Sequence, residues 1–132
     1  DASAILAFLN QEPGHKRVSQ ILAESVISAV NLSEAIAKLK EKNIPDHEIN
    51  LVLSYLNLEI IPFDEQAALY CAKLRPLTRH LGLSLGDRAC LGLAQQLNYT
   101  AITTDKAWGL IQYFTHRHFY RSCSLTECWE KS

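Results

Sequence analysis

Residues 26–30, with the sequence VISAV, indicate the fold class of this chain. The run is short, uncharged and rich in β-branched residues, which is typical of a buried strand. Two further runs have strand character, LEIIPF at 58–63 and AITT at 101–104. Since helical segments separate the three runs, each strand must cross over to reach the next. The sequence therefore predicts an α/β fold with a parallel sheet covered by helices on both faces.

The segments around these runs have the apolar spacing of helices, and 76–83 is expected to be a connector. A sheet of this kind also needs a strand before Asp1, and the sequence does not begin with Met, so we expect further upstream residues in the natural chain. The predicted helices span 2–10, 13–24, 32–42, 45–56, 64–74, 86–97 and 106–111.

Length and composition predict one soluble domain over residues 1–132. The longest apolar run, 4–9, is far shorter than the roughly 20 residues of a membrane span, so no membrane association is expected. The absence of a signal peptide and of any CxxC pair favours a reducing compartment, the cytoplasm. The net charge of −1 argues against a broad basic surface, so contact with nucleic acid would be local.

Four acidic residues fall close after predicted strands or in the first turns of helices: Asp1, Glu34, Asp87 and Asp105. The carboxyl ends of parallel strands share one edge of a sheet, where ligands bind. Carboxylates gathered there repel one another unless a cation compensates them. Mg²⁺ and Mn²⁺ prefer oxygen ligands, activate water and stabilise the leaving oxygen in phosphodiester hydrolysis.

Helix capping is the alternative interpretation of each acid. Asn31 and Glu34 have the spacing of a capping box, and so do Ser84 and Asp87. Asp105 and Asp1 could each cap the helix that follows. Because capping and metal binding are compatible, position alone does not decide between them, and the flanking residues must.

The flanking residues resemble a known family. Five motifs occur in order and at matching intervals: DASA at 1–4, SAVNLSEA at 28–35, IIPFDE at 60–65, LSLGDRACLGLA at 83–94 and ITTDKAW at 102–108. Together they resemble a PIN-domain ribonuclease, specifically the VapC-type toxin of type II toxin–antitoxin pairs. The resemblance covers residues 1–108 and implies a PIN-like three-layer α/β/α fold with a central parallel sheet.

The resemblance also implies function. It implies an Mg²⁺- or Mn²⁺-dependent endoribonuclease that cuts RNA, is neutralised by a cognate antitoxin and frequently forms a homodimer. Asp1, Asp87 and Asp105 match the metal ligands. Glu34 matches the remaining catalytic acid, which acts on the metal directly, through a metal-bound water, or as a proton acceptor. Two hydroxyl residues, Ser3 and Thr103, match the positions that support the acids.

Residues 109–132 form a divergent tail that does not follow the family, and its His and Cys residues match no common zinc pattern. The divergent tail and the missing strand leave open a catalytically silent PIN-like module that binds a protein or RNA partner. A phosphodiesterase acting on DNA is a further alternative. A phosphoacceptor receiver domain fits less well, because it would have paired acids after its first strand and a Lys after its last.

Overall fold

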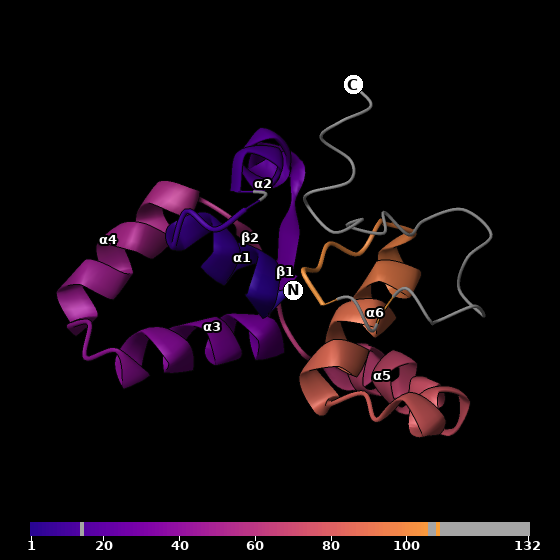
Figure 1. Ribbon diagram of the computed structural model, residues 1–132. Coiled ribbons are helices and arrows are strands. Elements are labelled where there is room, and N and C mark those ends of the chain that lie inside the picture. Colours follow the sequence, from indigo (N-terminus) through magenta and orange to yellow (C-terminus); the bar gives the residue numbers. More distant parts are fainter. Residues whose placement is uncertain (14, 106–107, 109–132) are drawn as a thin grey trace.

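A computed structural model of the chain describes residues 1–13, 15–105 and 108, and within them the structure is mainly helical with a small parallel sheet (Figure 1). The mixed α/β class is therefore confirmed. The elements are α1 (Ala2–Leu9), α2 (His15–Ile21), η1 (Leu22–Glu24), β1 (Val26–Ser28), α3 (Ala29–Glu41), α4 (Asp46–Leu56), β2 (Glu59–Ile61), α5 (Glu65–Thr78), η2 (Arg79–Leu81) and α6 (Leu85–Leu97).

The sheet pairs β1 with β2, and α3 and α4 form the crossover between them. The strands are parallel as predicted, with Ile27 opposite Ile60 and Ser28 opposite Ile61. Burial differs between the strands, since Ile27 is 4% exposed and Ile60 is 49% exposed. Strand β1 is thus covered more completely than β2.

The predicted strand at 101–104 is wrong as a regular strand, because only Ala101 forms a bridge. The amides that follow donate to side chains instead of to a neighbouring strand. The Thr104 amide donates to Ser3 Oγ, and the Asp105 amide donates to Thr103 Oγ1, both at 3.0 Å. Hydroxyl acceptors, one nearby in sequence and one from the start of the chain, thus satisfy amides that would otherwise bond to a neighbouring strand.

The ends of two elements also differ from the prediction. The first strand ends at Ser28 rather than at residue 30, because the Ser28 hydroxyl accepts from the Val30 amide and caps α3, which begins three residues earlier than expected. Residues 76–83 are not a connector, because α5 continues through Pro76 to Thr78. Leu74 and Thr78 are buried on either side of Pro76, and the Thr78 hydroxyl donates to the Leu74 carbonyl. The stabilisation from burying Leu74 and Thr78 outweighs the cost of the helical hydrogen bond that Pro76 cannot donate.

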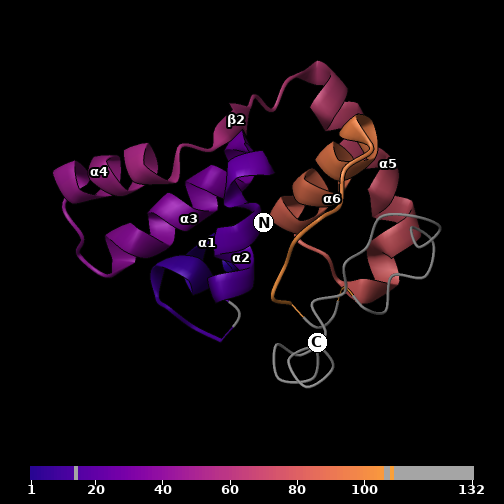
Figure 2. The same ribbon diagram turned by 90° about the horizontal axis from the view of Figure 1, so that it is seen from above.

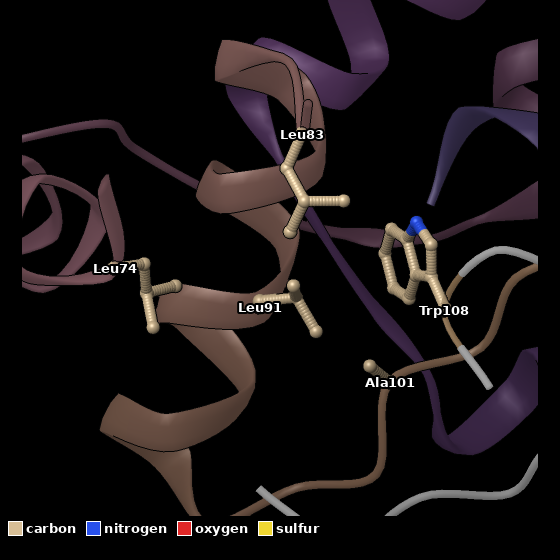
Figure 3. Packing of buried hydrophobic residues seen from close by; sticks show 5 residues of the cluster. All are labelled: Leu74, Leu83, Leu91, Ala101 and Trp108. Carbon is tan, nitrogen blue, oxygen red and sulfur yellow. The ribbon is translucent and has the colours of Figure 1, made fainter. Parts of the chain in front are cut away.

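Buried apolar residues form two clusters, one on each side of the start of the chain. Figures 1 and 2 show α1, α3 and α4 on one side and α5 and α6 on the other. The first cluster contains Ile5, Ile27, Ala35 and Leu56. The second contains Leu74, Leu83, Leu91, Ala101 and Trp108 (Figure 3).

Several further expectations concern single residues. Trp108 is 3% exposed and packs in the second cluster, so it is a packing residue. Cys71 is a buried, free cysteine, whereas the free Cys90 is half-buried. Burial raises the pKa of the Cys71 thiol, and the nearby Arg88 charge opposes that shift. The helix predicted at 106–111 and the tail at 109–132 lie outside the described residues, apart from Trp108.

Within the described ranges, no helix combines the length and the apolar character needed to cross a membrane.

The second cluster yields a stability prediction. Leu74→Ala should lower the free energy of unfolding by about 2–5 kcal/mol, because Leu74 is 1% exposed and its loss leaves a cavity. Leu77→Ala, on the same helix, is the control, because Leu77 is 51% exposed. Urea unfolding monitored by circular dichroism measures both, and equal losses would contradict this description of the core.

Candidate active site

The four acids singled out in the sequence line a single pocket in the structure. Asp1 precedes α1, Glu34 lies on α3, Asp87 lies in the first turn of α6, and Asp105 follows the bridge residue Ala101. The same pocket is lined by Ala2, Ser3, Leu6, Asn31, Ala37 and Lys38. Segments about 100 residues apart in sequence thus bring their carboxylates to one place.

The Asp1 carboxylate is held by three donors. Its Oδ1 accepts from the Ser3 hydroxyl at 2.7 Å and from the Ala4 amide at 3.0 Å, so Asp1 is also the N-cap of α1. Its Oδ2 accepts from the Thr103 hydroxyl at 2.7 Å. The two hydroxyl residues predicted to support the acids therefore both contact Asp1.

The same hydroxyls fix the segment that carries Asp105. Besides accepting from the amides of Thr104 and Asp105, Ser3 Oγ and Thr103 Oγ1 lie 3.3 Å apart. The main-chain nitrogen of Asp1 donates to the Ile102 carbonyl at 2.6 Å. This network joins the start of α1 to residues 102–105, and so places Asp105 beside Asp1 at the pocket.

Glu34 has a different environment from the one expected. The capping box predicted between Asn31 and Glu34 is wrong, because α3 begins at Ala29 and both residues lie inside the helix. Asn31 Nδ2 instead donates to Glu34 Oε2 at 3.1 Å and to the Gly86 carbonyl at 3.0 Å. Sequence reasoning missed this contact between α3 and α6. The sequence signal for the Asn31–Glu34 contact was an asparagine one helical turn before an acid.

The capping box predicted at Ser84 and Asp87 is confirmed. The Asp87 amide donates to Ser84 Oγ at 3.1 Å, and the Ser84 amide donates to Asp87 Oδ2 at 2.9 Å. Only one carboxylate oxygen takes part in the cap, and Asp87 also lines the pocket. Capping and a role at the pocket are therefore compatible for this residue.

Basic side chains are sparse around the acids. Lys38 lies one turn beyond Glu34 on α3, lines the pocket and is paired with Glu41 at 3.0 Å. No salt bridge of Arg88 is found among the described residues, where its buried Nε has no hydrogen-bond partner. Lys38 is thus the one cationic side chain that lines this pocket within the described part of the chain.

The pocket has the donor chemistry of a divalent-cation site, but the carboxylates do not close around one point. Across residues 1–13, 15–105 and 108, no three His, Cys, Asp or Glu side chains come close enough together to hold an ion. The acids offer only oxygen ligands, which Mg²⁺ and Mn²⁺ prefer. Since Mg²⁺ keeps several of its waters, this spacing fits an ion held partly through water.

A comparison with protein-family models decides the family, since residues 1–111 match the model described as the PIN domain. This chain belongs to the PIN domain family. PIN domains are generally nucleases and typically use divalent metal ions. A search of curated proteins and a search of solved structures each gave no significant match.

In this PIN domain the contact between Thr103 and Asp1 can be tested by stability. Thr103→Val keeps the shape of the side chain but removes the donor to the Asp1 carboxylate, and should lower the free energy of unfolding by about 1–3 kcal/mol. Thr100→Val is the control, because the half-buried Thr100 lies outside the pocket, and it should change the value by less than about 0.5 kcal/mol. Thermal and urea unfolding would show the difference, and similar values for both would refute the contact.

Proposed function

We propose that this PIN domain is a metal-dependent endoribonuclease that hydrolyses RNA phosphodiester bonds. One observation carries the proposal: Asp1, Glu34, Asp87 and Asp105 come from distant segments and line a single pocket. Carboxylates rarely gather without a compensating cation, and a nuclease family supplies the reason for one here.

In this proposal Asp1, Asp87 and Asp105 hold Mg²⁺ or Mn²⁺. The ion, when bound, activates the attacking water and stabilises the leaving oxygen. Glu34 orients that water or accepts its proton. The pocket encloses about 390 Å³, which leaves room for a hydrated ion, since a water occupies about 30 Å³ in the liquid.

Ser3 and Thr103 act in this proposal as supports for the first ligand. Their hydroxyls donate to different oxygens of Asp1, so the carboxylate cannot rotate without losing at least one bond. A ligand fixed before the ion arrives does not have to be ordered on binding, which lowers the cost of binding.

We further propose that the protein is the toxin of a type II toxin–antitoxin pair, acting in the cytoplasm as a homodimer and neutralised by a cognate antitoxin. The support is the order and spacing of the five sequence motifs within a PIN domain. The alternative, a catalytically silent module that binds a protein or RNA partner, is favoured by the failure of three acidic side chains to converge within the described residues.

Cleavage of labelled single-stranded and hairpin RNA tests the proposal directly. The protein should cut RNA with Mg²⁺ or Mn²⁺ and not with EDTA. Asp1→Asn and Asp87→Asn should each reduce the rate by roughly 100-fold or more, because each removes a charged ligand.

Asp64→Asn is the matched control, because Asp64 caps α5 through the Ala67 amide but lies outside the pocket. It should leave the cleavage rate unchanged. Cleavage that survives both pocket variants would point to a contaminant. A folded wild-type protein that cuts neither these RNAs nor cellular RNA would favour the silent module.

Lys38 should contact RNA phosphate, since it is the cationic side chain that lines the pocket among the residues that the structure describes. Lys38→Gln, made in the inactive Asp87→Asn protein, should weaken binding of single-stranded RNA several-fold and make the salt dependence of binding shallower. Lys40→Gln is the comparison, because Lys40 pairs with Asp46 and lies outside the pocket. Fluorescence anisotropy at several salt concentrations measures both, and equal effects would exclude a specific contact by Lys38.

A further inference from the structure

We propose that Asn31 and Gly86 are positioning residues that hold the Glu34 carboxylate against the first turn of α6, beside Asp87. We call this pair the Glu34 seat. Its consequence for catalysis rests on the nuclease function proposed above. Neither residue is an acid, and neither would touch the reacting atoms.

The Asn31 side chain connects two helices through one amide group. Its Nδ2 donates to Glu34 Oε2 on α3 and to the Gly86 carbonyl on α6, at 3.1 and 3.0 Å. Both partners are acceptors, so only the NH₂ end of the amide can face them. The orientation of the Asn31 side chain is therefore fixed by its two contacts.

Packing alone is a poor explanation for Asn31. The residue is 1% exposed, and its Oδ1 is buried without a hydrogen-bond partner in the described part of the chain. An apolar side chain would fill the same space without burying that carbonyl oxygen. What Asn31 offers in return is a pair of donors, and Glu34 receives one of them.

Gly86 has no side chain, and this leaves space for the Glu34 carboxylate. A Cβ built at this position would overlap the Glu34 carboxylate, so the carboxylate lies directly against the Gly86 backbone. The backbone itself does not require glycine, because Gly86 is not among the residues with positive φ. In the first turn of a helix alanine would be the better residue. Glycine at this site therefore makes room for Glu34.

Together the two contacts fix one acid relative to another. Gly86 directly precedes Asp87, which is itself held by the Ser84 cap. The Glu34 seat thus sets the placement of Glu34 on α3 relative to Asp87 on α6. Because displacement of a catalytic group by about 1 Å can cost roughly 100-fold in rate, loss of the seat should reduce turnover without removing any acid.

Two glycine variants separate positioning from stability. In Gly86→Ala the three atoms nearest the new Cβ belong to the carboxylate end of the flexible Glu34 side chain, so the carboxylate should swing away while the protein stays folded. We expect kcat for RNA in Mn²⁺ to fall roughly 10- to 100-fold, with KM and the midpoint of thermal unfolding little changed.

Gly92→Ala is the matched control on the same helix. A Cβ there would lie 3.0 Å from the Cys71 nitrogen and 3.2 Å from the Tyr70 carbonyl carbon, both backbone atoms of α5. It should lower the unfolding midpoint and leave kcat per folded molecule unchanged. The reverse pattern, with kcat unchanged in Gly86→Ala, would overturn the proposal.

Two further readouts identify Glu34 as the residue through which the seat acts. In a Glu34→Gln background, Gly86→Ala should cause no further loss of the residual kcat, whereas a general structural effect would persist. The second readout does not depend on catalysis. Glu34→Ala should shift the side-chain amide signals of Asn31 in a ¹⁵N–¹H spectrum and leave those of the exposed Asn50 in place.

These measurements also separate the two proposals. Wild-type protein that cuts no RNA would overturn the nuclease function and the catalytic role of the seat, while the Asn31 amide signals would still show whether the contact exists. Wild-type cleavage with unshifted Asn31 signals in Glu34→Ala would overturn the seat alone.

Discussion

The hydrogen bonds from Ser3 and Thr103 to the Asp1 carboxylate are the interaction on which the arrangement of the pocket depends. The Thr103 bond joins the start of α1 to a segment about 100 residues away. Charge-assisted bonds of this kind are stronger than neutral ones and have defined directions. Together with the bond from the Asp1 main-chain nitrogen to the Ile102 carbonyl, they place Asp105 beside Asp1, although residues 102–105 form no regular strand.

Neutral hydrogen-bond donors offset the repulsion between the carboxylates that line the pocket. Asp1 is met by two hydroxyls, Glu34 by the Asn31 amide and Asp87 by the Ser84 amide. Fixed dipoles of this kind offset part of the charge repulsion without adding a cation that would compete for the site. A lysine in their place would neutralise an acid permanently. Neutral donors leave the negative charge available for a cation that comes from solution.

The sequence was sufficient to predict the class and the parallel strands, because both follow from local pattern. It also singled out the acids that meet at the pocket, from their positions and from the family resemblance of the residues around them. Whether the acids act as predicted stays a prediction. Contacts between elements were harder. The strand at 101–104 failed because strand propensity says nothing about competing hydroxyl acceptors. Helix α5 passes Pro76 because Leu74 and Thr78 are buried. The Asn31 contact depends on how closely α3 approaches α6, which no spacing along one chain segment reveals.

The division of the apolar core into two clusters has a consequence for how the protein responds to ligands. Asp1 and Glu34 belong to the helices of the first cluster, whereas Asp87 and Asp105 belong to the side of the second. Any species that binds all four carboxylates therefore bridges the two halves. By linkage, its binding free energy adds to the resistance of the whole molecule to unfolding. A change in how fully the pocket is occupied should therefore change the free energy of unfolding of the whole protein.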